Sequence, residues 1–591
     1  MNDSMIFGGC SVNTIPMASS ATGFSTSGTA GFRSTTDECA VVLFRVRTHY
    51  SDRSRAEDPI RRRARQSSKR LTVYRSGGQI LIEALDAHGV DTLFGIPGIH
   101  TLPIYDALYE HHRIHHVMTR HEQGAGYMAD GYARVTGRVG VVLTTTGPAA
   151  INALTPVGEA NAESSPVLLI ASGPDDDMTP DSGYLHEMRD QFNTLVSVTG
   201  QGKRARTGQE IVAGVAEAMS FVGRRRPRPY VLEVPIGVLK QEYEVEPPTP
   251  QMYPPIVPSE ADIQKAVELL NVAERPLLFV GGGAQDASRE VARLAELLQA
   301  KVGVSANGLG VLSADDPRFV DTNDTPGWWI SRADVIVAIG TRFDARTRSW
   351  IGSPEAELIH IDLDPEVIGR SLPAEVALVG DAAATVEILL SQLNGDRTSS
   401  WPEREQRAPE QEDDERTAAI LTTLRQVMAR DAILFNDMTL VCYRARRFFD
   451  VYTPRSFHSP LTYGSLGFSV PAAIGAKIAE RQRQVVALCG DGGFMFTAQE
   501  VLTAKQERLG LPIVLFNDNC YSAIRRAQDR EYEGRHVAVA LDNPDFQLLA
   551  KSFGIPSVRV VSAKELGSEV QRAFARDLPT LIEVELERFE I

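Results

Sequence analysis

The feature that most constrains the fold is a series of short apolar runs that alternate with helical stretches. Examples of these runs are VGVVLTTTGP, SPVLLIASGP, PLLFVGGG and QVVALCGDGG. Runs of this kind are typical of strands that are buried on both faces, and the helical stretches between them supply the crossovers that parallel strands require. The pattern predicts an α/β protein with doubly wound parallel sheets.

Two stretches of different composition interrupt this pattern and predict three domains. QEYEVEPPTPQMYPPIVPSE is acidic and rich in proline, and NGDRTSSWPEREQRAPEQEDDER is strongly charged, so both are typical of linkers. We expect domains at 71–238, 259–395 and 417–591, with linkers at 239–258 and 396–416. The chain of 591 residues is too long for a single core, and each predicted domain has an ordinary size.

Residues 1–70 differ in composition from the rest of the chain. The stretch MASSATGFSTSGTAGF is rich in Ser, Thr and Gly, and RTHYSDRSRAEDPIRRRARQSSKR is basic. With 11 Lys and Arg against 6 Asp and Glu, this segment carries +5 and the remainder carries −20. We expect a disordered extension. It is either a transit peptide, a segment without function, or the product of a start codon chosen too early.

The composition excludes several classes of function. A net charge of −15 argues against a general role in nucleic-acid binding. No apolar run reaches the ~18 residues that indicate a membrane span. The 5 cysteines show no metal-ligand spacing, and three lie in or beside predicted buried elements of the last domain. Cysteine usage of this kind favours a reducing cytosol, and hence a cytoplasmic protein.

A lone carboxylate stands where a buried strand ends. The apolar run from Val485 to Cys489 is followed by Gly490, Asp491, Gly492 and Gly493, and then by a helix expected to start near Phe494. The next predicted strand ends in Asn517, Asp518 and Asn519. Because ligands of doubly wound sheets bind beyond the carboxyl ends of the strands, we expect Asp491 and Asp518 to meet there and hold Mg²⁺ beside a phosphate group. The alternative is a helix cap followed by an ordinary turn.

At this point the chain resembles a known family. The stretch GDG is followed, after 24 residues, by ND. This arrangement is similar to the signature of thiamine-diphosphate enzymes. TRHEQGAGYMADGYARVTG and TYGSLGFSVPAAIGAK also resemble motifs of the acetolactate synthase-like enzymes, and FGIPGIHTLPIYDAL resembles their 5-guanidino-2-oxopentanoate decarboxylase branch. The resemblance spans nearly all of 71–591. It implies a pyrimidine-binding, a central and a diphosphate-binding domain, in that order. It also implies a homodimer or homotetramer, since each cofactor contacts two subunits.

The resemblance assigns roles to individual residues. Glu122 would exchange a proton with the cofactor's aminopyrimidine and so favour the tautomer that the reaction needs. Leu466 would hold the cofactor in its bent form. Asp491, Asp518 and the backbone carbonyl of Cys520 would bind Mg²⁺, with Asp518 standing where the family usually has Asn. The implied cofactor-binding residues are Glu122, Thr439, Leu440, Gly464, Leu466, Gly490, Asp491, Gly492, Gly493, Asp518 and Tyr521.

The reaction type depends on two further positions. His186, in GYLHEMRDQ, stands where the synthases have Gln, and Ala527 stands where they have a Trp that selects the second substrate. Both differences favour protonation after loss of CO₂, for which histidine is a natural donor, and hence a 2-oxo acid decarboxylase. His121 is a weaker catalytic candidate. The alternatives are an acetolactate synthase-type carboligase and an inactive cofactor-binding homologue.

The side chain of the small-molecule 2-oxo acid remains open. If it is cationic, as in 5-guanidino-2-oxopentanoate, the nearby acids Glu187, Asp190 or Asp529 could pair with it. Arg525 and Arg526 argue against such a substrate if they also face the pocket.

The second domain raises the question of a flavin. FVGGGAQDASRE and GTRFDARTR resemble the loops on which acetolactate synthases carry a structural FAD. DDPRFVDTNDTPGWWISRADVIV lacks the small-residue loop that those enzymes place near the flavin, and it is shorter. FAD, another nucleotide and a vestigial site therefore all remain possible.

Overall fold

The computed structural model describes residues 74–590 except 221, 223, 247, 251–252, 321–325, 344–354, 396–397 and 403–411. The predicted extension at 1–70 lies outside these residues, as does part of the predicted linker at 396–416. No helix in the described residues is both long and apolar enough to span a bilayer, and the cytoplasmic location stays a prediction.

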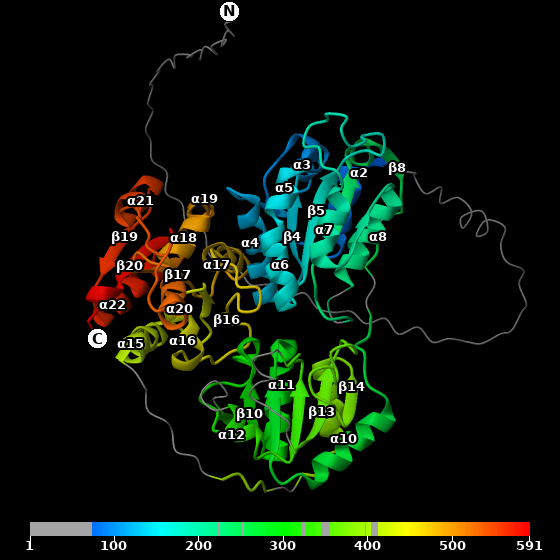
Figure 1. Ribbon diagram of the computed structural model, residues 1–591. Coiled ribbons are helices and arrows are strands. Elements are labelled where there is room, and N and C mark those ends of the chain that lie inside the picture. The colour runs from blue at the N-terminus through cyan, green and yellow to red at the C-terminus, as the bar shows by residue number, and fades with distance from the viewer. Residues whose placement is uncertain are drawn as a thin grey trace, which may run out of the picture. The chain divides into compact units, whose positions relative to one another are not determined.

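The structure confirms the predicted fold class, because it contains three parallel sheets of six strands each. In Figure 1 the strands of each sheet run side by side, with helices against them. The first sheet has the order β3-β2-β4-β5-β7-β6. Its strands are β2 (Thr92–Gly95), β3 (His115–Met118), β4 (Gly140–Thr144), β5 (Val167–Gly173), β6 (Gly202–Arg204) and β7 (Tyr230–Pro235). Its helices are α2 (Gly77–Ala87), α3 (Leu102–Glu110), α4 (Glu122–Thr136), α5 (Pro148–Asn152), α6 (Leu154–Glu163), α7 (Gln191–Thr199), α8 (Gly208–Met219) and α9 (Ile236–Lys240).

The second sheet has the order β11-β10-β9-β12-β13-β14. Its strands are β9 (Pro276–Val280), β10 (Lys301–Val304), β11 (Phe319–Val320), β12 (Val335–Ile339), β13 (Glu357–Asp362) and β14 (Val376–Val379). Its helices are α10 (Glu260–Val272), α11 (Ser288–Leu298), α12 (Pro326–Ile330) and α14 (Ala382–Gln392). A short antiparallel pair, β1 (Tyr74–Ser76) with β8 (Glu242–Glu244), lies outside the three sheets, and β8 falls within the predicted linker at 239–258.

The third sheet has the order β16-β15-β17-β18-β20-β19. Its strands are β15 (Ile433–Asn436), β16 (Phe457–His458), β17 (Val485–Gly490), β18 (Pro512–Asn517), β19 (Ser557–Val560) and β20 (Thr580–Glu585). Its helices are α15 (Glu412–Val427), α16 (Leu440–Phe448), α17 (Ser469–Ala479), α18 (Asp491–Thr497), α19 (Val501–Gln506), α20 (Ser522–Tyr532), α21 (Phe546–Phe553) and α22 (Ala563–Phe574). The strands β15, β17 and β18 are neighbours, so their carboxyl ends meet at one edge.

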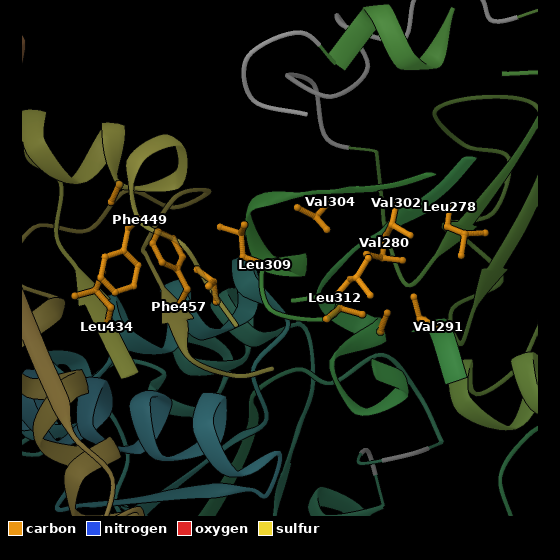
Figure 2. Packing of buried hydrophobic residues seen from close by; sticks show 14 of the residues in the cluster. Leu278, Val280, Val291, Val302, Val304, Leu309, Leu312, Leu434, Phe449 and Phe457 are labelled. Atoms are coloured by element: carbon orange, nitrogen blue, oxygen red, sulfur yellow. The ribbon is translucent and has the colours of Figure 1, made fainter. Parts of the chain in front are cut away.

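One hydrophobic cluster is shared by the second and third domains. It includes Val304 of β10, Leu309 and Leu312 after that strand, and Phe449 and Phe457 of the third domain. Figure 2 shows Leu309 between Val304 on one side and Phe457 on the other. Burial of this continuous apolar surface favours a fixed arrangement of the two domains.

The helices α4 and α17 carry two of the small-residue motifs and pack directly against each other. A Cβ placed on Gly131 would lie 2.0 Å from the carbonyl oxygen of Ala472, and one on Gly475 would lie 1.9 Å from that of Met128. Glycine at both positions therefore lets the two backbones touch. This contact fixes the start of α4, where Glu122 lies, relative to the third domain.

Candidate active site

Asp491 is the first residue after β17 and is 3% exposed. Its Oδ1 accepts a hydrogen bond from the backbone N–H of Gly492 at 2.9 Å, and its Oδ2 accepts one from Nδ2 of Asn543 at 2.7 Å. The helix predicted to start near Phe494 begins three residues earlier, because α18 starts at Asp491 itself. The carboxylate therefore lies at the carboxyl end of the strand, within the first turn of the helix.

Asp518 follows the neighbouring strand β18 and lies close to Asp491. Residues Gly490 and Phe516 are partners in the ladder of the two strands. Burial raises the pKa of Asp491, and the charge of Asp518 raises it further, against the hydrogen bonds from Gly492 and Asn543 that lower it. A carboxylate whose ionisation is opposed by a second carboxylate beside it fits a divalent cation, which would remove the conflict.

The third predicted metal ligand, the carbonyl of Cys520, lies two residues beyond Asp518. The backbone there is held by an isolated β-bridge between Cys520 and Ala540. Asn519, which lies between Asp518 and Cys520, has φ +52°. No group of three or more His, Cys, Asp or Glu side chains suited to a metal occurs in the described ranges. A site of two carboxylates and one carbonyl is compatible with that finding, since Mg²⁺ usually keeps several waters and binds the substrate's phosphates.

The glycines around Asp491 are packed against other predicted cofactor-binding residues. A Cβ on Gly492 would lie 2.5 Å from Cε1 of Tyr521, and one on Gly490 would lie 3.4 Å from Cβ of Thr439. Thr439 is the residue before α16, whose first residue is Leu440. Gly493 packs against Asp437, since a Cβ there would lie 3.2 Å from its Oδ1. The structure thus brings Thr439, Gly490, Gly492 and Tyr521 around the end of β17.

Asp437 holds the loop that contains Leu466. Asp437 was not among the predicted site residues. It is buried, and its carboxylate accepts hydrogen bonds from the backbone N–H groups of Gly467 at 3.3 Å and Ser469 at 3.2 Å. Leu466 is half-buried in this loop, directly before Gly467. Gly464 has φ +78°, and a Cβ there would lie 3.6 Å from Cε of Met438. Asp437 follows the strand in AILFND, so the reasoning applied to Asp491 would have found it.

Glu122 is the first residue of α4 and is half-buried. Its Oε2 accepts a hydrogen bond from Nδ2 of Asn152 at 2.9 Å. His121 precedes it as the helix N-cap, and its Nδ1 accepts a hydrogen bond from the backbone N–H of Gln123 at 3.1 Å. The capping contact gives His121 a structural task, since this nitrogen must be unprotonated to accept.

A buried acid of the third domain, Glu500, supports the start of α4. Its carboxylate accepts the backbone N–H of Arg120 at 3.1 Å, and Thr503 donates its hydroxyl to it at 2.9 Å. Burial raises the pKa of Glu500 to about 7, although these hydrogen bonds lower it. Gly124 leaves room for this carboxylate, because a Cβ there would lie 2.4 Å from its Cδ. A contact between residues 380 apart in the chain carries no local sequence signal.

His186 is held in an uncommon backbone conformation. Its φ is +63°, and its carbonyl oxygen lies 2.6 Å from where a Cβ on Gly147 would stand. Its Nδ1 is 3.2 Å from the hydroxyl oxygen of Thr146. Thr146 lies two residues before the helix α5 and Asn152 is its last residue, so the histidine and Glu122 contact the same short segment. Strained backbone of this kind clusters at functional sites.

The acids proposed to face a cationic substrate have partners in the described residues. Glu187 accepts the backbone N–H of Asp181 and that of Gly183, and Asp190 caps α7 through Asn193. Asp529 on α20 pairs with His536 at 2.6 Å. Ala527 lies on the same helix and is half-buried, whereas Arg525 and Arg526 are exposed.

A cavity of about 290 Å³ lies at the carboxyl ends of the second sheet's strands. Its lining includes the glycine turn 281–283, Asn307, Arg226, Arg342 and Asp362. Burial raises the pKa of Asp362 to about 6, against the charges of Arg226 and Arg342. Part of the GTRFDARTR loop and part of DDPRFVDTNDTPGWWISRADVIV lie outside the described residues.

Comparison with known protein families gives matches in all three domains. The description "Thiamine pyrophosphate enzyme, N-terminal TPP binding domain" matches residues 75–194, the central domain of the same enzymes matches 263–389, and their C-terminal TPP binding domain matches 437–584. Thiamine pyrophosphate is another name for thiamine diphosphate. The chain therefore belongs to the thiamine-diphosphate enzymes of the acetolactate synthase-like family.

Curated relatives fall into two kinds of enzyme. A "Probable 2-ketoarginine decarboxylase" of Pseudomonas aeruginosa is 37% identical over 537 residues, which cover 88% of this chain and 95% of the relative. The acetolactate synthase large subunit of Corynebacterium glutamicum is 32% identical over 542 residues, 86% of each chain. A probable acetolactate synthase large subunit of Methanocaldococcus jannaschii is 30% identical over 548 residues, 87% of this chain and 92% of the relative.

Proposed function

We propose that this enzyme decarboxylates a 2-oxo acid longer than pyruvate to an aldehyde and CO₂, with 5-guanidino-2-oxopentanoate (2-ketoarginine) as the first substrate to test. The observation that carries the proposal is the placement of His186, held in a constrained backbone, against the segment 146–152, which also contacts Glu122. The relative described as a 2-ketoarginine decarboxylase supports the same reaction. Carboligation of the acetolactate synthase type is the alternative.

Different residues of the chain would have different roles in the reaction. Thiamine diphosphate, when bound, supplies a carbon nucleophile and an electron sink for the loss of CO₂. Glu122 would exchange a proton with the bound cofactor, and Leu466 would pack against it. Asp491, Asp518 and the carbonyl of Cys520 would hold Mg²⁺, which would offset part of the negative charge of the two carboxylates and the diphosphate. His186 would give a proton to the carbon that has lost CO₂, and this protonation would lead to release of an aldehyde and not to carboligation.

The experiment that tests the reaction is product analysis with two substrates. The enzyme is incubated with pyruvate alone and then with 5-guanidino-2-oxopentanoate, and the products are identified. We expect CO₂ and the matching aldehyde from the longer acid. Acetolactate as the main product, with no aldehyde from the longer acid, would favour the carboligase.

Replacing His186 with Gln should move the products toward carboligation. The variant loses the proton donor and gains the residue that acetolactate synthases have at this position, so the carbon is protonated more slowly. We expect aldehyde release to fall by roughly 10- to 100-fold, the lower range of general acid effects, while consumption of the 2-oxo acid falls less. The measurement is the ratio of aldehyde to carboligation product at several pH values. The exposed His112 provides the matched control, His112→Gln, and an unchanged ratio in His186→Gln would remove the histidine from the proposal.

We further propose that the active enzyme is a homodimer or homotetramer in which each cofactor contacts two chains. Glu122 belongs to the first domain and Asp491 to the third, and no hydrogen bond or ion pair joins them in the described part of one chain. Exposed apolar side chains lie beside both, namely Ile151 next to Asn152, and Met495 and Phe496 on α18. A second copy would cover them.

A mixing experiment tests whether the site is shared between chains. Glu122→Gln and Asp491→Ala are each expected to be inactive as homodimers. If sites are shared, a mixed dimer has one intact site and one doubly altered site, so random mixing restores about a quarter of the wild-type activity. The subunits are dissociated together, reassociated and assayed, with each variant treated alone as the control. Mixtures with no more activity than the separate variants would place both residues in a single-chain site.

The cavity at the carboxyl ends of the second sheet's strands, which residues of the first and third domains also line, supports a nucleotide as a second ligand. Its glycine turn lets a diphosphate approach the backbone, and Arg226 and Arg342 supply positive charge. The same features suit FAD and an adenine nucleotide. We therefore propose that the cavity binds the diphosphate that both ligands share, without assigning a flavin. The absorbance spectrum and mass spectrum of ligand released from the purified enzyme distinguish the two, and a fully active enzyme that releases neither would overturn it.

A further inference from the structure

Two histidines in the first domain share one buried hydroxyl. Nδ1 of His100 is 2.5 Å from Oγ1 of Thr146, and Nδ1 of His186 is 3.2 Å from the same oxygen. The ring centroids of the histidines are 5.4 Å apart, with an angle of 72° between the planes. Thr146 is 1% exposed, so water does not compete for its hydroxyl. His100 lies in the turn after β2, a different segment from the one that carries His186.

The hydrogen count on this hydroxyl constrains the protons of both rings. Thr146 has one hydrogen to donate and lies between two ring nitrogens. If it donates to one Nδ1, the other Nδ1 must carry a hydrogen and donate to the threonine oxygen. The chain of hydrogen bonds therefore runs in one of two directions, and reversing it moves a proton from one ring to the other.

We propose that His100, Thr146 and His186 form one proton-holding unit, in which His100 resupplies through Thr146 the proton that His186 gives to the substrate carbon. The proposal rests on the proposed decarboxylation and deepens it, because it names the residue that recharges the donor. His100 does not itself touch the substrate and acts through His186.

The proton transfer balances without any further reactant. In the starting state His100 carries the extra proton and donates from Nδ1 to Thr146, which donates to Nδ1 of His186. The N–H bond at Nε2 of His186 breaks as the new C–H bond forms at the carbon that lost CO₂. His186 gains a hydrogen at Nδ1 from Thr146, Thr146 regains one from His100, and His100 is left neutral until solvent returns one proton to Nε2 of His186 and the chain of hydrogen bonds reverses.

The surrounding charges favour a single extra proton on the pair. Burial lowers the pKa of His100, the charges of His186 and Lys240 lower it further, and Asp175 raises it. Near His186, Glu187 is engaged by the backbone N–H groups of Asp181 and Gly183. Two cationic rings this close oppose each other, so protonating one ring makes protonation of the second harder.

The pair is also within reach of the reacting groups. Thr146 and Asn152, which donates to Glu122, are six positions apart, and Asn152 is the last residue of α5. At the helical rise of 1.5 Å per residue, the five residues of α5 span roughly 7.5 Å. One bound substrate can therefore contact His186 while the cofactor contacts Glu122.

The first test measures titration of the two rings without reference to turnover. Diethylpyrocarbonate modifies neutral imidazole, and mass spectrometry of the peptides gives the reaction rate of each histidine as a function of pH. In the full chain without added cofactor, His186→Asn should raise the titration midpoint of His100, because the charge of His186, which lowers the pKa of His100, has been removed. His112→Asn, at an exposed position, is the control and should leave it unchanged. An unchanged midpoint of His100 in His186→Asn would overturn the shared proton.

The second test follows the relay in the cofactor-loaded enzyme. Thr146→Val keeps the shape and removes the hydroxyl, whereas Thr146→Ser keeps the hydroxyl. We expect Thr146→Val to lower kcat for aldehyde release by about 10-fold and to change its pH profile with little change in KM, and Thr146→Ser to restore both. A wild-type rate and pH profile in Thr146→Val would overturn the relay. If the wild-type enzyme releases no aldehyde from any 2-oxo acid, the decarboxylase proposal fails, and the titration shift alone decides whether the rings share a proton.

Discussion

Replacing Glu122 with Gln is expected to abolish most turnover while leaving cofactor binding nearly intact. The amide keeps the length and shape of the side chain, and its oxygen can still accept the hydrogen bond from Nδ2 of Asn152. It cannot exchange a proton with the cofactor's aminopyrimidine. We expect kcat to fall by roughly 100-fold or more, the scale of a lost general acid or base. Steady-state kinetics and a binding titration with thiamine diphosphate and Mg²⁺ separate the two effects.

The matched control is Glu110→Gln, which makes the same chemical change at an exposed residue at the end of α3. It should have wild-type kinetics. A second comparison is Asn152→Ala, which removes the partner of Glu122 and leaves the carboxylate in place. We expect an intermediate loss, because the acid is then present but less well oriented. Turnover close to wild type in Glu122→Gln would mean that another group carries the proton.

The buried strands were predictable because each carries its own signal. The run QVVALCG is apolar along its length and becomes β17, and the run PLLFV becomes β9. Strands at the sheet edges were missed. The strand β6 has three residues, Gly202–Arg204, and β3 has only four, two of them histidines. Runs this short and polar have no periodicity to detect, and they are strands because a neighbouring strand supplies their hydrogen bonds.

The start of α18 shows tertiary packing outweighing local preference. Glycine is a poor helix former, and the helix after the GDGG stretch was expected to start only near Phe494. The helix nevertheless begins at Asp491. Side chains on Gly492 and Gly493 would collide with Tyr521 and crowd Asp437, so these positions require glycine whatever its helix propensity.

The site could be predicted in its parts but not in its assembly. The motif around Asp491 and the one around Glu122 stand out in the sequence, because each is compact. The contacts that orient them join distant residues, such as Asn152 with Glu122 and the buried Glu500 with Arg120. His100 and His186 are likewise 86 positions apart in the numbering and meet only through Thr146. A single sequence does not show such pairs, since nothing local marks either member.

Replacing Asp491 with Ala is expected to remove the cofactor's metal anchor. The variant loses one of two carboxylates that lie close enough for Asp518 to raise the pKa of Asp491, so one cation ligand and one of the compensating charges disappear together. We expect thiamine diphosphate to bind at least about 100-fold more weakly at a fixed Mg²⁺ concentration, with activity lost in parallel. The measurement is a titration with cofactor and Mg²⁺, followed by protein fluorescence.

Two comparisons separate metal binding from a damaged fold, because Asp491 also accepts hydrogen bonds from Gly492 and Asn543. Asp518→Asn restores the ligand that the family usually has, so it should bind cofactor within a few-fold of wild type. The second comparison is thermal unfolding. Mg²⁺ and thiamine diphosphate together should raise the Tm of the wild type and of Asp518→Asn, because a ligand that binds only the folded state stabilises that state. They should leave the Tm of Asp491→Ala unchanged. A cofactor affinity and a Tm shift equal to those of the wild type in Asp491→Ala would show that the carboxylate at the end of β17 only caps its helix.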